Sequence, residues 1–176
     1  MKKIGIVIMV FFSFFYIGCF SDSSDTTSIP PIRVPIDLSK SGEKVEFDVK
    51  VDGKAKPYYV QIEFIRTNKV ENVVSDFEIL IKIVGSTFYR GGKRVGPGVV
   101  IPINIKIYKE ENVKKLIFDK TYNSQWASGY TREYIERDIE KFKLDKGKYK
   151  FVVTNIKSIL EMKNRKANIR FARRSK

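Results

Sequence analysis

The side chains that most often perform catalysis are nearly absent from this sequence. Its 176 residues include no histidine and a single cysteine, Cys19. Without imidazole the chain cannot form a Ser-His-Asp triad, a Cys-His pair or a histidine metal site. We therefore predict a protein that is not an enzyme and that uses no cofactor and no metal.

Carboxylates are the catalytic groups that remain. Four of them are crowded into a segment of eight residues: Glu133, Glu136, Asp138 and Glu140. A pair of such groups can support glycoside hydrolysis when one is protonated and the other is charged. The four alternate with cations: Arg132, Arg137 and Lys141. This alternation favours a solvated, salt-bridged face over a catalytic pair.

A second group of candidate residues lies in the glycine-rich stretch 86–98, STFYRGGKRVGPG, which we predict to be a loop. Its cations are Arg90, Lys93 and Arg94. Successive backbone amides beside cations can form a nest that binds an anion. The stretch lacks the Lys-Ser/Thr ending of a P-loop, so it does not predict nucleotide binding. A solvated hairpin loop is the simpler interpretation, and the sequence favours it.

Four aromatic residues fall in predicted loops rather than strands: Phe88, Tyr89, Trp126 and Tyr130. Aromatic side chains in exposed loops often anchor a binding partner. Such side chains can equally close the open end of a hydrophobic core. If they bind, the candidate surface consists of these four aromatics together with Arg90, Lys93 and Arg94.

The N-terminus predicts export from the cytosol. Lys2 and Lys3 precede an unbroken run of 14 apolar and small residues, 4–17. This run is too short to cross a bilayer, which needs about 20 helical residues. A short apolar run behind a basic start is typical of a secretory signal peptide. We predict that residues 1–18 are removed as a signal peptide; the alternatives are a signal cleaved elsewhere and an anchor helix.

The residues around the cysteine support this prediction. Tyr16-Ile17-Gly18-Cys19 resembles a bacterial lipobox, in which a small residue precedes the cysteine that becomes the acylated N-terminus. Tyr16 departs from the pattern, which usually has an aliphatic residue there. The resemblance implies that Cys19 carries fatty acyl chains such as palmitate, and each buried methylene adds about 0.8 kcal/mol of membrane affinity. Phe20 is not the aspartate that resembles an inner-membrane retention signal, which favours the outer membrane.

The chain is strongly basic, with 34 lysine and arginine residues against 20 acidic ones. Removal of residues 1–18 leaves 32 basic and 20 acidic residues, a net charge of +12. An exported protein of this charge is predicted to meet anionic lipid, acidic glycan or an acidic protein, and no nucleic acid. The densest basic stretch is 163–176, which could add affinity for an anionic membrane surface. A lysine-rich proteome would explain the charge without any such role.

Behind the signal, residues 19–31 are polar and end in two prolines, which predicts a lipidated cysteine on a flexible tether. From residue 32 the apolar residues alternate with polar ones, as in strands with one buried face. Such alternation occurs at 34–38, 45–51, 58–64, 101–107, 116–118, 149–153 and 167–171. Pro35 confines the first of these strands to a sheet edge.

One segment has a helical period instead. Residues 77–84 place apolar side chains on a single stripe. Ser75 and Glu78 are spaced as a capping box, and Gly85 can end the helix in a left-handed conformation. The β-branched content of 79–84 argues for a strand, but the caps favour a helix. Residues 123–131 are predicted to be an irregular connection, and 132–144 fit either a helix or an exposed strand.

Together these elements predict an all-β fold. The number and spacing of the strands favour an antiparallel β-sandwich of about 7–8 strands with one short inserted helix, over residues 32–172. A basic tail, 173–176, follows. Tyr149 begins a strand directly after a tight turn and resembles the tyrosine corner of β-sandwiches, where the hydroxyl bonds to upstream backbone.

Several of these segments resemble a family of small bacterial lipoproteins that carry one β-sandwich domain of unknown function. The resembling segments are 34–39, 58–59, 96–98, 102–107 and 144–149. The resemblance covers about 32–172 and implies a non-catalytic binding domain held at the cell envelope. Lipoproteins of similar design include immunity proteins that neutralise toxins, so a periplasmic or cell-surface protein partner is expected. The alternative is a structural envelope module that holds anionic lipid or glycan through its basic loops and tail.

Overall fold

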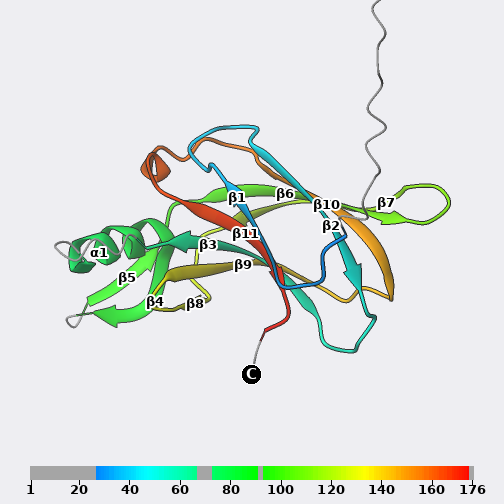
Figure 1. The fold of residues 1–176 in the computed structure, drawn as a ribbon. Coiled ribbons are helices and arrows are strands. Elements are labelled where there is room, and N and C mark those ends of the chain that lie inside the picture. The colour runs from blue at the N-terminus through cyan, green and yellow to red at the C-terminus, as the bar shows by residue number, and fades with distance from the viewer. Residues whose placement is uncertain (1–26, 67–72, 91–92, 175–176) are drawn as a thin grey trace, which may run out of the picture.

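The computed structural model describes residues 27–66, 73–90 and 93–174. Two antiparallel sheets pack face to face, and a helix and a two-stranded hairpin are attached at one end (Figure 1). The predicted all-β sandwich is confirmed.

The eleven strands and the helix of the described residues have the following bounds. The four-stranded sheet has the order β2 (Lys44–Val51), β10 (Gly147–Asn155), β6 (Ile101–Glu110) and β7 (Lys115–Ser124). The five-stranded sheet has the order β1 (Ile32–Ile36), β11 (Ala167–Ala172), β3 (Tyr58–Ile65), β9 (Tyr134–Phe142) and β8 (Gly129–Tyr130). The attached elements are α1 (Val73–Val84) and the hairpin of β4 (Gly85–Arg90) with β5 (Lys93–Pro97), and a 3-10 turn, η2 (Leu160–Met162), precedes β11.

The core lies between the two sheets and follows from the period-two patterns. In β6, for example, every second residue from Ile101 to Ile107 is at most 1% exposed. Aromatic side chains from both sheets meet in the middle, where the ring centroids of Phe151 and Phe171 lie 4.6 Å apart. Full burial of each such side chain contributes about 1.5–3 kcal/mol, so the sandwich needs no disulfide to hold it together.

The N-terminal part of the domain joins both sheets. β1 is an edge strand, as Pro35 predicts, and pairs only with β11 among the described strands. Part of the segment predicted to be a tether is paired with the domain, because Ser28 forms a parallel bridge with Val49 of β2. The Ser28 N–H donates to Asp48 O at 3.1 Å, and the Lys50 N–H donates to Ser28 O at 3.1 Å. The polar composition of this segment does not predict the pairing. Ser28 can pair there because β2 is an edge strand of its sheet.

The predicted helix is present but starts earlier. α1 begins at Val73, so Ser75 lies inside it and the predicted N-cap is wrong. The apolar stripe is confirmed, with Leu80 and Val84 fully buried. Gly85 follows the helix with φ = 77°, the left-handed conformation that glycine adopts without strain.

Two predicted irregular segments contain strands. Residues 86–98 form most of the β4–β5 hairpin rather than a loop, and the ambiguous 132–144 contains β9. In β9 the charged residue Arg137 occupies an inward position, which interrupts the apolar pattern expected of a buried strand face. A register shift opposite Val60 and Gln61 also places an extra residue, Ile139, in the strand. Part of 123–131 belongs to β7 and β8.

The predicted tyrosine corner is confirmed. The Tyr149 hydroxyl donates to the carbonyl oxygen of Asp145 at 3.0 Å, across the turn that leads into β10. Burial of the ring raises the pKa of Tyr149, so the hydroxyl stays protonated and can donate.

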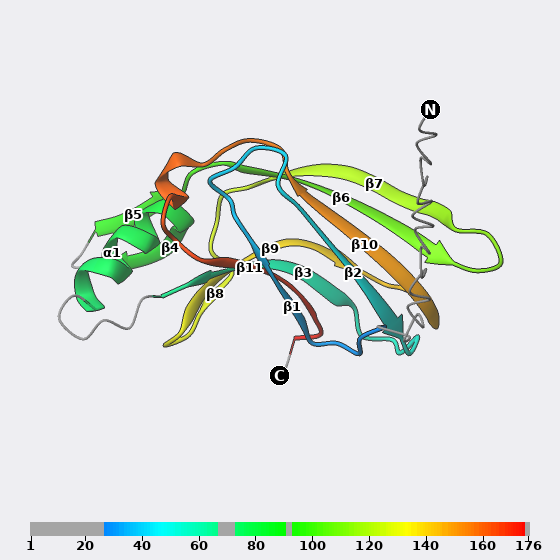
Figure 2. The same ribbon diagram turned by 45° about the horizontal axis from the view of Figure 1, so that its top comes forward.

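The strand directions give the sandwich two different ends (Figure 2). Val51 pairs with Gly147, and Lys148 pairs with Glu110, so the loops that follow β2 and β6 and precede β10 share one end. We call this the terminal end; it contains loops 52–57, 111–114 and 143–146, and the described chain both enters and leaves there. The opposite end, which carries α1, β4, β5 and β8, is called the helical end.

Candidate binding surface at the helical end

The two segments predicted to form a binding surface lie together at the helical end. The Gly98 N–H donates to the carbonyl of Gln125 at 2.9 Å, and the Ala127 N–H donates to the carbonyl of Gly85 at 3.3 Å. The base of the β4–β5 hairpin is therefore tied to the chain on either side of Trp126. Neither strand periodicity nor composition predicts this contact, because it joins residues about 30 to 40 positions apart.

The hairpin carries five of the predicted binding residues: Phe88, Tyr89, Arg90, Lys93 and Arg94. Its backbone pairing opposes Tyr89 to Arg94 and Arg90 to Lys93, so these residues gather toward the hairpin's outer part. The side chains of 87–90, 93 and 94 lie outside the described part of the structure. Their contribution to binding stays a prediction.

The two other predicted aromatics are open to solvent. Trp126 is 39% exposed, and Tyr130 in β8 is 56% exposed. An aromatic residue that closes the end of a hydrophobic core is largely buried. The exposure of Tyr130 therefore argues against this alternative for Tyr130. Ile79 of α1 and Val100, beside the hairpin base, are also exposed at this end. The helical end thus presents apolar side chains from three separate segments.

Arg137 holds this end together. Its side chain is 0% exposed, and it donates to four backbone carbonyls. Nε donates to Val84 O at 2.7 Å and Nη2 to Ile83 O at 2.8 Å, at the C-terminus of α1. Nη1 donates to Val99 O at 2.9 Å and to Ser124 O at 2.8 Å. One guanidinium therefore joins the helix, the chain after the hairpin and the end of β7.

The electrostatics of this contact suit a cation. The partial negative charge at a helix C-terminus attracts positive groups, and the guanidinium also lies over the Phe64 ring at 5.4 Å. Burial lowers the pKa of Arg137 to about 9, while the four accepting carbonyls favour the charged form. The side chain is therefore charged at neutral pH. The prediction that Arg137 belongs to a solvated face is wrong.

We call the contact of Arg137 with these four carbonyls the Arg137 clamp. Two glycines leave space for it. A side chain at Gly98 would overlap Nη2 of Arg137 and the carbonyl oxygen of Ile83. A side chain at Gly85 would overlap the backbone of Gly98 and Gln125. Close approach of three backbone segments, rather than loop flexibility, explains why glycine occurs at these positions.

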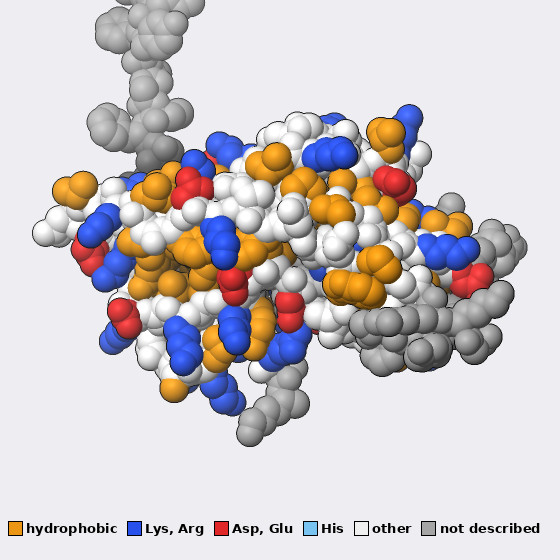
Figure 3. Space-filling view, turned by 180° about the vertical axis from the view of Figure 1, so that it is seen from behind, with side chains coloured by type: hydrophobic (Ala, Val, Ile, Leu, Met, Phe, Trp, Pro, Cys, Tyr) orange, Lys and Arg blue, Asp and Glu red, His pale blue; other side chains and the backbone are white. Residues whose placement is uncertain are grey.

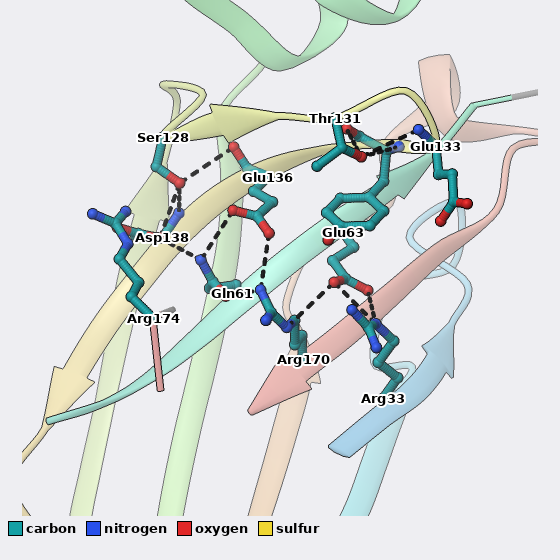
Figure 4. Close-up of polar contacts among 11 residues, drawn as sticks. Arg33, Gln61, Glu63, Ser128, Thr131, Glu133, Glu136, Asp138, Arg170 and Arg174 are labelled. Carbon is teal, nitrogen blue, oxygen red and sulfur yellow. Dashed lines mark hydrogen bonds and ion pairs between the residues drawn. The ribbon is translucent and has the colours of Figure 1, made fainter. Parts of the chain in front are cut away.

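Two of the crowded carboxylates, Glu136 and Asp138, lie on the outer face of the five-stranded sheet, where they take part in a polar network (Figure 4). Glu136 accepts from Arg170 Nη1 at 2.9 Å, and Asp138 accepts from Gln61 Nε2 at 2.8 Å. Ser128 Oγ also donates to Asp138, at 2.9 Å, and Arg174 forms an ion pair with the same carboxylate.

The network continues to the edge strand β1 through a buried carboxylate. Glu63 is 0% exposed and accepts from Arg33 Nε at 2.8 Å, with Arg170 Nε 3.4 Å away on the other side. Arg33 and Arg170 also flank grooves of about 480 and 400 Å³, respectively. The salt-bridged interpretation of Glu136 and Asp138 fits this geometry, but the cations come from β11 and the residues after it. Sequence spacing pointed instead to neighbours on the same strand.

The remaining predicted site residues lie elsewhere. Cys19 and the signal segment are outside the described residues. The basic stretch 163–176 is not one patch: residues 163–166 precede β11 at the helical end, whereas Arg173 and Arg174 follow it at the terminal end. There Arg173 is paired with Asp52 and Arg174 with Asp138. Within the described part of the chain, no group of three or more acidic, histidine or cysteine side chains could hold a metal ion. No helix there is both long and apolar enough to cross a membrane.

Comparison with known proteins assigns a family but no activity. The family model described as "Domain of unknown function (DUF5625)" matches residues 33–173. The crystal structure of a protein from Sulfurospirillum deleyianum is similar, with 31% sequence identity and a TM-score of 0.68. The match covers 83% of this chain and 98% of that one. No curated protein sequence matches. The chain therefore belongs to the DUF5625 family.

Proposed function

We propose that the protein is a lipid-anchored, non-catalytic binding domain of the bacterial cell envelope, whose helical end occludes the surface of another protein. An immunity protein that blocks a periplasmic toxin is the most concrete form of this proposal. Cys19, placed after a short apolar run and the basic residues Lys2 and Lys3, supports the anchor.

The observation that carries the proposal is the opposite placement of the two ends. The chain enters the domain at the terminal end, where Ser28 pairs with β2. The segments with exposed Trp126 and Tyr130 lie at the helical end. A domain fastened through its N-terminus would therefore hold these aromatics away from the membrane, where a second protein can reach them.

The residue types at the helical end suggest the chemistry of the partner. Aromatics and arginines are enriched at the centres of protein interfaces, and hairpin residues Arg90, Lys93 and Arg94 add three cations. An acidic surface on the partner would complement them and speed association. The clamp at Arg137 would keep the surface in one conformation before binding, which reduces the entropy lost on association.

The test is site-specific photo-cross-linking in cells of the source organism. A cross-linking amino acid replaces Tyr130 in one variant and Lys54, an exposed residue of loop 52–57, in the control. We expect one discrete protein adduct from position 130 and none of the same mass from position 54. Loss of both aromatic side chains, in W126A/Y130A, should weaken binding of the captured protein at least about 30-fold. No adduct at 130, or the same adduct from both positions, would contradict the proposal.

A further inference from the structure

The β6–β7 hairpin exposes apolar side chains at the terminal end. Val113 is 78% exposed, and Leu116 and Ile117 are 46% and 42% exposed. The strand register shifts here: Ile107 pairs with Phe118 but Tyr108 pairs with Leu116, which leaves Ile117 as an extra residue in β7. Such a bulge changes the direction of the side chains, so that adjacent apolar residues both contact solvent.

Cations surround these apolar residues. Lys114 and Lys115 are exposed at the tip, and the Lys114 ammonium lies 4.7 Å from the Tyr108 ring centre. Figure 3 shows hydrophobic side chains and cations side by side where the hairpin projects, at the left of that view. The terminal end is basic in composition. It contains eleven lysine and arginine residues and four acidic residues, counted over 52–57, 109–115, 141–148 and 173–174. An apolar tip inside a basic surround matches the lipid–water boundary of an anionic membrane.

The length of chain between Cys19 and the domain limits how far the terminal end can lie from a membrane that holds Cys19. Nine peptide units separate Cys19 from Ser28, which is fixed to β2. Even fully extended, this segment spans no more than about 30 Å. If Cys19 is acylated, as the proposed function requires, the bilayer lies within that distance of Ser28, at the end from which the hairpin projects.

We propose that the β6–β7 hairpin is a second membrane contact, which places Val113, Leu116 and Ile117 in the interface of an anionic bilayer with lysines among the headgroups. A single attachment at Cys19 would not by itself fix the orientation of the domain relative to the membrane. Two contacts at the terminal end fix its orientation and point the helical end away from the membrane. The inference rests on the proposed function in one respect: acylation of Cys19 is what places the bilayer near the hairpin. The affinity of the hairpin for an anionic bilayer does not depend on that acylation.

A fluorescent label provides the test. If Cys19 is acylated, Val113→Cys introduces the only free thiol in the processed chain, and an environment-sensitive dye can be attached there. Leu160→Cys is the matched control, because Leu160 is 75% exposed and lies at the opposite end. The protein is purified with its N-terminal lipid and placed in vesicles of equal parts phosphatidylglycerol and phosphatidylcholine. Mass spectrometry of the same sample reports the acylation.

We expect a blue-shifted dye at 113, with a several-fold loss of quenching by aqueous iodide, and an unchanged dye at 160. Ile117→Cys should give the same result as Val113→Cys, which guards against a local effect of one substitution. An acylated protein with a water-exposed dye at both 113 and 117 would overturn the hairpin contact and leave the anchor intact. A chain without acyl groups whose dye at 113 still shifts on these vesicles would overturn the anchor alone. A shift that needs no vesicles and grows with protein concentration would assign the hairpin to a second copy of the chain instead.

Discussion

Replacement of Arg137 by methionine should loosen the helical end and destabilise the whole domain. The guanidinium donates to carbonyls of Ile83, Val84, Val99 and Ser124 and is fully buried. Methionine fills a similar volume but donates no hydrogen bond. The buried carbonyls of Ile83, Val84 and Ser124, and the partly buried carbonyl of Val99, therefore lose a charged donor.

The expected magnitude follows from these bonds. A hydrogen bond to a charged group contributes about 1.5–3 kcal/mol, and four of them are lost. Ile83 O keeps one partner, the Val99 N–H at 2.8 Å, so its loss is smaller. Removal of the buried charge also recovers part of its desolvation cost. We therefore expect the free energy of unfolding to fall by about 3 kcal/mol, rather than by the sum of four bonds.

Denaturant unfolding measures this change, and hydrogen exchange locates it. Lys141→Met is the control, because Lys141 lies on the same strand but is exposed, and its change should stay within about 0.5 kcal/mol. In R137M the amides of Gly98, Val99 and Ala127 should exchange faster than those of the central strands. A loss below about 1 kcal/mol with unchanged exchange at these amides would refute the role of the clamp.

Three further outcomes are expected. Gly85→Ala should destabilise clearly more than Gly42→Ala in thermal unfolding: both glycines have φ = 77°, but only at Gly85 would a side chain overlap other backbone, so equal effects would argue against close approach. Tyr149→Phe should lower the free energy of unfolding by about 1 kcal/mol through loss of the corner hydrogen bond, and no change would indicate that the hydroxyl is equally well solvated when unfolded. The Lys150 ammonium, and then Lys44, lower the pKa of Glu46 from 4.5 to about 2, so its stabilisation is present above pH 4.5 and is lost as the pH falls toward 2. Unfolding curves of Glu46→Gln and the parent should then differ by less than about 1 kcal/mol at pH 7 and converge as the pH falls through 2; a constant difference would exclude this ion pair as its cause.

The sandwich follows from the sequence because its core strands are regular. The alternation in β2 and β6 predicts which face is buried, and Pro35 and Tyr149 predict an edge strand and a corner. Each of these signals depends on neighbouring residues alone. The expected class of fold therefore required no knowledge of which strands pair.

The errors occur where distant residues decide the structure. Arg137 faces the core because carbonyls from three other segments surround it, and local charge alternation placed it on the surface. Gly98 lies outside the strands, as predicted, but its backbone packs against that side chain, which its place in a solvated loop does not predict. The cations that pair with Glu136 and Asp138 come from Arg170 and Arg174, about 35 residues further along the chain. The local signal for the Arg137 clamp is an arginine at an inward strand position. Gly85 and Gly98, which leave space beside it, are the other sequence feature that indicates it.

The most direct measurement of the central claim is the mass of the N-terminal peptide of the mature protein, isolated from the membrane fraction. The account predicts that Cys19 is the first residue, that it carries fatty acyl chains, and that Cys19→Ser releases the protein from the membrane. A water-soluble mature protein with an intact thiol at Cys19, or with its first residue elsewhere, would contradict it.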